Sequence, residues 1–174
     1  EDLTRLALAQ YFCELAVELV PEGTDSQEYL RLVLNALHFL SKGTRSPELL
    51  KPLVELRMLS LSGYMPDLVC CAQCGAYESE RMYFKVNRGT IYCKDCYLPK
   101  GDPFVALSPG ALSAMRHIIY VDFDRLFRFQ LAPGPTGELA AAAEAYLVHT
   151  LQKRPKTLDF YKSLASALSD PGET

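Results

Sequence analysis

Four cysteines in the middle of the chain form two Cys-x2-Cys pairs, Cys71 with Cys74 and Cys93 with Cys96. The 18 residues 75–92 separate the two pairs, and this spacing is typical of zinc knuckles. Each pair can direct two thiolates from a tight turn towards one ion, so two segments distant in the sequence must meet. The pattern therefore predicts one structural zinc ion, Zn²⁺, bound by all four cysteines.

Cys70 directly precedes Cys71 and offers an alternative first ligand. It would leave three residues before Cys74, whereas Cys71 keeps the two pairs alike, so we assign Cys71. Four thiolates fill a tetrahedral site and leave no position for water, which argues against a zinc enzyme. Disulfides and a redox pair also disagree with the sequence, because no βαβ pattern surrounds the pairs and the chain has a cytosolic character.

The segment between the two cysteine pairs differs in composition from its surroundings. The stretches "MYFKV" and "TIY" are rich in aromatic and β-branched residues and flank the turn-forming "NRG". This arrangement predicts a short β-hairpin from Met82 to Tyr92. Such a hairpin would return the second cysteine pair to the first.

The first helix is expected from Leu3 to Val20. Its polar residues Gln10, Glu14 and Glu18 lie four apart on one narrow stripe, which predicts a helix buried on most sides. Cys13 in this helix is interpreted as a small core residue.

A second helix is predicted after "TDSQE", where Thr24 or Asp25 can cap its start. Its expected apolar face consists of Leu30, Val33, Leu34 and Leu37. Polar residues at spacings of three and four form the other face and place His38 on the solvent side.

Further helices are expected over residues 47–62, from Ser108 onwards, over residues 137–153 and over residues 158–168. The stretch "DFDRLFRFQL" fits a helix or a strand, and we interpret it as a helix. The stretch "APGPTG" is expected to break the chain before the Ala-rich helix. The fold class is therefore mainly α, a helical bundle with an inserted small four-cysteine zinc module that contains a β-hairpin.

The expected division of the chain follows from these elements. It comprises a helical region over residues 1–68, the zinc module over 69–104, a helical region over 105–170 that completes the bundle, and a disordered tail over 171–174.

Charge and motifs limit the function classes. The formal net charge is −3 and the pI is about 5.6, so the chain lacks the strong positive field of an autonomous nucleic-acid-binding domain. Phosphate-binding glycine loops, the nucleophile elbow and the H-E-x-x-H motif are absent from the sequence, and we expect no enzymatic activity. No apolar run reaches membrane-spanning length, and no signal peptide opens the chain, so a cytoplasmic location is expected.

A basic stretch near the end carries Lys153, Arg154, Lys156 and Lys162 against the single acidic residue Asp159. These cations can simply complement the dipole of a helix end. They can also form a basic shelf beside apolar side chains that receives an acidic peptide tail or a DNA backbone. Arg88 at the hairpin tip leaves the same two interpretations open, a solvated charge or a contact with a phosphate or an acidic partner.

Three stretches carry a resemblance to the bacterial recombination mediator RecO family of DNA repair proteins. "LVELRMLSLSGYMPDLVCCAQCG" resembles the helix of that family that runs into the first knuckle, and "GTIYCKDC" resembles the second knuckle. "HTLQKRPKTLDFYKSL" resembles the closing helices, with Thr157 where a serine is usual. The resemblance covers essentially the whole chain. The N-terminal OB-fold of the family has no counterpart in this sequence, so we expect a fragment.

The resemblance implies a protein of the RecF pathway that works in the bacterial cytoplasm at the nucleoid. Members of this family anneal single strands and help to load recombinase with the partner RecR and the single-strand-binding protein. Contact with single-stranded DNA would come mainly through the OB-fold. This fragment would then contribute a surface for the acidic, aromatic-ended C-terminal tail of the single-strand-binding protein, with Arg154 and Lys156 as candidates. Lys153 and Arg88 are further candidates for contact with a partner or with DNA. The alternative is a stand-alone zinc module with protein partners and no DNA function.

Overall fold

The computed structural model describes residues 2–23, 25–99 and 101–169, and within these ranges the chain forms six α-helices, four strands and one short 3₁₀ helix. The helices are α1 (Asp2–Leu19), α2 (Gln27–Lys42), α3 (Pro47–Leu61), α4 (Pro109–Tyr120), α5 (Pro133–Leu151) and α6 (Lys156–Ser169). The strands are β1 (Asp67–Cys71), β2 (Met82–Lys85), β3 (Thr90–Cys93) and β4 (Phe104–Leu107), and the 3₁₀ helix is η1 (Phe123–Arg125). The predicted mainly α fold with a small β module is confirmed.

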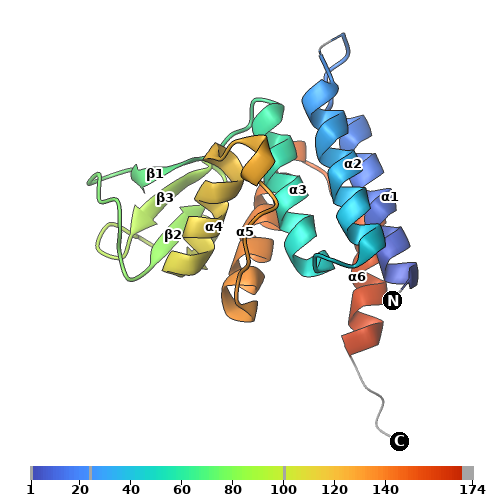
Figure 1. Cartoon of the computed structure of the whole chain (residues 1–174). Helices are drawn as coiled ribbons and strands as arrows, with labels where there is room; N and C mark the ends of the chain where they lie inside the picture. Colours follow the sequence, from blue (N-terminus) through green and yellow to red (C-terminus); the bar gives the residue numbers. More distant parts are fainter. Residues whose placement is uncertain (1, 24, 100, 170–174) are drawn as a thin grey trace, which may run out of the picture.

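The elements are arranged in layers, from the sheet at one end of the molecule to the N-terminal helices at the other (Figure 1). The sheet packs against α4 and α5, these two helices pack against α3, and α3 in turn contacts α1 and α2. The last helix, α6, returns to lie along α1. One continuous cluster of buried apolar side chains runs through all these layers.

The hairpin of the β module forms as predicted, with β2 and β3 antiparallel and Met82 opposite Cys93. The sheet is larger than predicted, because β1 pairs in parallel with β3 and β4 pairs antiparallel with β2, in the order β1-β3-β2-β4. β1 and β4 are no shorter than the hairpin strands, but no tight turn joins either of them to its partner strand, so no local hairpin signal indicates their pairing. These two strands cover both outer edges of the hairpin.

The prediction that α1 is buried on most sides is wrong. Its buried residues form one face, Ala7, Leu8, Tyr11, Phe12, Leu15 and Leu19. On the opposite side Leu3, Leu6 and Val17 are exposed, and Cys13 is exposed rather than part of the core. The main packing neighbours of α1 are α2, α3 and α6, and they leave the side with Leu3, Leu6 and Val17 exposed.

The predicted apolar face of α2 is rotated relative to the observed one. Leu30 and Leu34 are exposed, while the buried residues are Tyr29, Leu32, Val33, Ala36 and Leu40. Apolar residues occupy more positions of this helix than one face can cover, so packing against α3 decides the orientation. His38 is on the solvent side, as predicted. Asp25 accepts a hydrogen bond from the Gln27 N–H at the helix start, whereas Thr24 lies outside the described residues.

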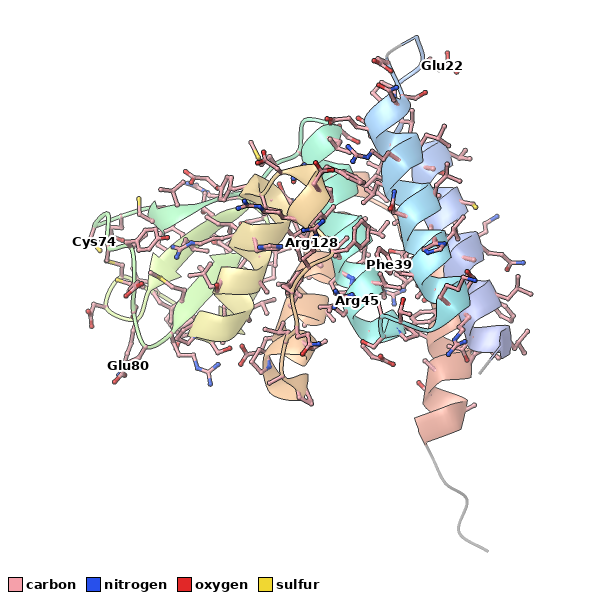
Figure 2. All side chains as sticks on the ribbon, viewed as in Figure 1. Glu22, Phe39, Arg45, Cys74, Glu80 and Arg128 are labelled. Carbon is pink, nitrogen blue, oxygen red and sulfur yellow. The ribbon has the colours of Figure 1, made fainter. Side chains whose placement is uncertain are left out.

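The stretch after α4 is not the predicted helix. Only Phe123–Arg125 form a 3₁₀ turn, and the following residues cross towards the α2–α3 corner, where Phe127 packs against Phe39 with ring centroids 4.9 Å apart. Figure 2 labels Phe39, Arg45 and Arg128 near the middle of the view. Arg45 Nη1 donates to the carbonyl of Phe129 at 2.9 Å. Tertiary aromatic contacts therefore replace helical periodicity in this segment.

The "APGPTG" stretch belongs largely to α5, which begins at Pro133 rather than after a break. Prolines are tolerated in the first turn of a helix, because the N–H groups there have no intrahelical partner. The hydroxyl of Thr136 donates to the Ala132 carbonyl and supports that turn.

The strands extend over Asp67–Leu107, and the predicted division at residues 69 and 104 remains a prediction. The predicted tail, residues 171–174, lies outside the described residues. Among the helices of the described part of the chain, none has the length and apolar character needed to cross a membrane.

Candidate functional site

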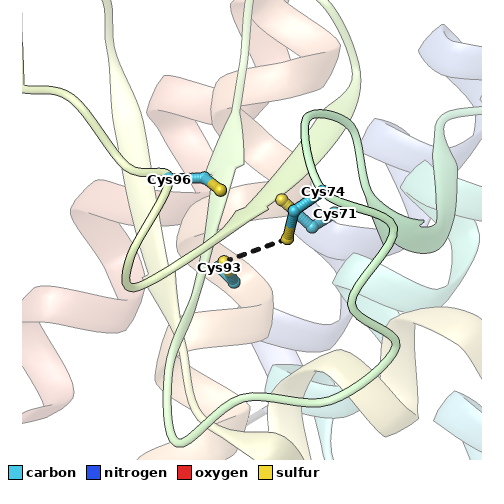
Figure 3. Close-up of side chains that lie close together, drawn as sticks. All are labelled: Cys71, Cys74, Cys93 and Cys96. Carbon is cyan, nitrogen blue, oxygen red and sulfur yellow. Dashed lines mark hydrogen bonds between the residues drawn. The ribbon is translucent and has the colours of Figure 1, made fainter.

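The two predicted cysteine pairs come together at one end of the sheet (Figure 3). Cys71 and Cys93 are the last residues of β1 and β3, and Cys74 and Cys96 follow in the adjoining turns. The four Sγ atoms lie within 4.8 Å of one another, and those of Cys74 and Cys93 are 3.6 Å apart. Cys74 lies at the end of the sheet that points away from α1 and α2 (Figure 2).

Two tight turns aim the second cysteine of each pair. In the first turn the Gly75 N–H donates to the Cys71 carbonyl at 2.9 Å, and Gly75 has a φ of +75° that an L side chain rarely adopts. In the second turn the N–H groups of Cys96 and Tyr97 donate to the Cys93 carbonyl at 3.1 and 2.9 Å. The two pairs are thus built alike. Cys70 does not belong to the cluster, which contains Cys71 instead.

Backbone dipoles favour negative charge on the first cysteine. Burial opposes ionisation of the Cys71 thiol, but nearby backbone N–H groups of Cys74, Cys93 and Gln73 outweigh it and lower the pKa of Cys71 to about 6. Hydrogen bonds with Cys74 and Cys93 raise the pKa of Cys96 to about 12. A set of four thiolates at this distance therefore requires a cation, and the structure positions the four cysteines to bind a metal ion.

A groove of about 1010 Å³ lies away from the cysteine cluster, between α5, α6 and the start of α3. On the α5 side it is lined by small or apolar side chains, Gly137, Ala140, Ala141, Ala145 and Val148. Tyr161 and Ala165 of α6 form the facing wall. The groove is therefore lined mostly by small and apolar side chains.

Three cations meet one carboxylate in this groove. Glu144 of α5 lies 2.9 Å from Lys51 Nζ, 2.8 Å from Lys162 Nζ and 3.1 Å from Arg154 Nη2. Burial opposes ionisation of Glu144, but the hydrogen bond from Lys162 and the charge of Lys51 outweigh it and lower the pKa of Glu144 to about 2. Arg154 also pairs with Asp159, through its Nε.

The predicted basic residues have different surroundings. Arg154 lines the groove, whereas Lys153 pairs with Glu18 of α1 and the exposed Lys156 lies outside the groove lining. Arg88 is exposed at the turn between β2 and β3 and also lies outside the groove.

The "RPKTL" element has a structural role in addition to its charges. Glu14 of α1 accepts hydrogen bonds from the N–H groups of Lys156 and Thr157, at 3.1 and 2.9 Å, and from the Thr157 hydroxyl. Glu14 therefore holds the first turn of α6, where a negative charge complements the helix dipole.

Lys51 and Glu144 were not anticipated as site residues. One signal was present, because Lys51 interrupts the apolar run "LLKPLVEL" and has Glu55 four residues later on the same face. A lone lysine in such a run is expected to have an acidic partner. Its second partner, Glu144, is 93 residues away and gives no local signal.

Comparisons with known proteins agree with the resemblance. A family model for the C-terminal part of recombination protein O matches residues 1–159. The DNA repair protein RecO of Acetivibrio thermocellus is 31% identical over 94% of this chain and 64% of its own length. The DNA repair protein RecO of Symbiobacterium thermophilum is 32% identical over 96% of this chain and 67% of its own length.

A third relative, the DNA repair protein RecO of Desulforamulus reducens, is 31% identical over 94% of this chain and 63% of its own length. The chain thus spans about two thirds of the length of these relatives. The family model matches 159 of the 174 residues, and the four predicted cysteines lie together in the fold. The chain belongs to the RecO family of DNA repair proteins and corresponds to their C-terminal part.

Proposed function

We propose that this chain is the partner-binding, zinc-stabilised part of a non-enzymatic DNA repair mediator. In this proposal the whole protein anneals single-stranded DNA and helps to load recombinase in the RecF pathway, together with RecR and the single-strand-binding protein, at the nucleoid of the bacterial cytoplasm. Family membership supports the DNA repair role. Contact with single-stranded DNA is assigned mainly to an N-terminal OB-fold outside this chain.

The groove between α5, α6 and the start of α3 is the proposed partner-binding surface. Its small apolar side chains offer space for an aromatic ring, and Arg154 and Lys162 at its wall are 40% and 50% exposed, so they can turn towards a ligand carboxylate. A peptide with several acidic residues and an aromatic end matches this combination. The C-terminal tail of the single-strand-binding protein is the proposed occupant, while Lys153, Lys156 and Arg88 remain candidates for outer contacts with this tail or with DNA.

Binding of a synthetic peptide tests this surface. A fluorescein-labelled peptide of four aspartates followed by a C-terminal phenylalanine should bind the chain, with an affinity that falls as salt rises. Arg154→Ala and Lys162→Ala should each weaken binding about 3- to 10-fold and flatten the salt dependence. Lys94→Ala, which removes an exposed charge in the β module, is the matched control. Equal affinity in all four proteins would reject the groove as the tail site.

Zinc is the proposed metal of the cysteine cluster. Zn–S bonds of about 2.3 Å in a tetrahedron place the sulfurs about 3.8 Å apart, and the observed separation of Cys74 and Cys93, 3.6 Å, fits this value. Zinc bound by four thiolates would hold the turns of the β module in place. Elemental mass spectrometry on protein purified without added metal should find one zinc per chain, with Cys13 and Cys70 as the reactive thiols.

A further inference from the structure

The three cations around Glu144 fall into two kinds. Lys51 is only 7% exposed and also pairs with the buried Glu55 at 2.8 Å, so it is fixed in the protein. Arg154 and Lys162 are long side chains at the surface and share the outer side of Glu144. Only these two can move to a ligand without leaving a buried charge unpaired.

The cations of the groove all have partners within the chain. Lys51, Arg154 and Lys162 pair with the three carboxylates Glu55, Glu144 and Asp159. The exposed Glu48 also lines the groove and adds a further negative charge. A ligand carboxylate that approaches Arg154 or Lys162 therefore meets cations that already have a partner, and it is repelled by Glu144 at short range. The groove thus contains two cations that a ligand carboxylate could bind, Arg154 and Lys162, but both already pair with Glu144.

We infer that Glu144 is an internal competitor that sets the selectivity of the groove. It binds Arg154 and Lys162 in place of a ligand carboxylate, so a simple polyanion gains little there. A ligand that also fills the apolar part of the groove can draw these two cations away, while Glu144 keeps Lys51. This inference rests on the proposed function of the groove as a peptide site.

The lowered pKa of Glu144 agrees with this role, because it reflects how strongly neighbouring cations, Lys162 and Lys51 among them, favour the ionised carboxylate. A repulsion between two carboxylates about 6 Å apart at a partly solvated site corresponds to a change in Kd of about 5- to 10-fold. Glu144→Gln removes the repulsion and keeps a hydrogen-bond acceptor for Lys51. Its side chain has nearly the same shape, so the groove itself is preserved.

The test compares the whole chain with its Glu144→Gln variant, using the aspartate–phenylalanine peptide and a poly-aspartate of equal length without an aromatic end. The peptide should bind the variant about 5- to 10-fold more tightly, with a steeper salt dependence, and poly-aspartate should gain at least as much. Glu138→Gln is the matched control, because it removes one negative charge from the same helix outside the groove lining and should change Kd less than 2-fold. Circular dichroism confirms that each variant is folded.

The outcomes separate the two proposals. If the wild-type chain binds the peptide and Glu144→Gln binds it equally or more weakly, the competitor role is overturned and the groove stands. If no protein binds either probe, both are overturned. Glu144→Asp keeps the charge but withdraws it by one methylene from Lys162, and it should show a smaller gain; if Glu144→Gln fails to fold, absence of any gain in Glu144→Asp overturns the inference.

Discussion

The hydroxyl of Tyr11 in α1 donates a 2.6 Å hydrogen bond to Glu55 Oε1 in the middle of α3. Glu55 is fully buried and also pairs with Lys51. Burial raises the pKa of Glu55, although Lys51 and Tyr11 both oppose that shift. Two helices are thus connected by a polar contact inside an otherwise apolar core, and the same contact leads through Lys51 to the groove.

Tyr11→Phe should destabilise the chain by about 1–3 kcal/mol, because Glu55 would lose a donor in a site without water access. The measurement is urea unfolding followed by circular dichroism. Tyr97→Phe is the control, since Tyr97 stacks on Tyr83 in the β module, and its change should stay within about 0.5 kcal/mol. Equal midpoints for Tyr11→Phe and the wild type would show that this hydrogen bond contributes nothing to stability.

Gly89→Ala should be more harmful than an ordinary glycine substitution. Gly89 has a φ of +61°, and a Cβ there would lie 2.8 Å from the Tyr146 hydroxyl oxygen of α5. Strain and overlap together should cost about 2–4 kcal/mol. Gly63→Ala is the control with a φ of +88° and open space around the Cβ, and it should cost about 1–2 kcal/mol. Similar losses in both variants would mean that Tyr146 moves aside freely.

Loss of a metal ligand should act locally. Cys93→Ser should remove amide-exchange protection from β2 and β3 while the amides of α1 and α3 stay protected, because the helices have their own buried contacts. Hydrogen exchange read by mass spectrometry resolves these segments. Cys70→Ser, outside the cluster, should leave the pattern unchanged. Exchange throughout Cys93→Ser would show that the metal site supports the whole fold, and unchanged protection would show that it supports none.

Acid should weaken the contacts of Glu144. A carboxylate whose pKa is lowered on folding stabilises the protein above its unfolded pKa, and that stabilisation is lost as pH falls through the folded value. For Glu144 the window runs from about pH 4.5 down to about pH 2. The wild type should exceed Glu144→Gln by about 1–3 kcal/mol at pH 6, and the difference should vanish near pH 2.

Urea unfolding at several pH values measures this difference. Glu55 is present in both proteins, but Glu144 helps to raise its pKa, so the measured difference includes this interaction between the two carboxylates. Glu80→Gln is the control, since the Glu80 side chain is 84% exposed. A difference between wild type and Glu144→Gln that does not change with pH would contradict the assignment.

The cysteine cluster could be predicted because its information is local. A spacing of two residues fixes each turn, and the aromatic and β-branched stretches between the pairs indicate the hairpin that joins them. Helix positions were also predicted closely, because caps, prolines and apolar periodicity are local signals. The face of a helix that is buried was not predicted correctly for α2, as the exposed Leu30 and Leu34 show.

The groove required information that no single stretch contains. Its charged centre joins Lys51 to Glu144 across 93 residues. The apolar run around Lys51 indicates an acidic partner, but nothing in the sequence near Glu144 identifies it as that partner. The segment after α4 was misread for a related reason, because contacts such as Phe127 with Phe39 decide its path. Sequence patterns report periodicity within an element, whereas these features arise between elements.

The buried side of the sheet also has a consequence for the protein in a cell. Phe84 meets Tyr146 of α5 edge to face, with ring centroids 5.5 Å apart, and Met82, Phe84 and Ile91 belong to the same core as α4 and α5. A chain whose β module unravels would uncover this apolar flank on helices that remain folded. Metal starvation would then yield an aggregation-prone protein that chaperones and proteases recognise, rather than a folded but inactive protein.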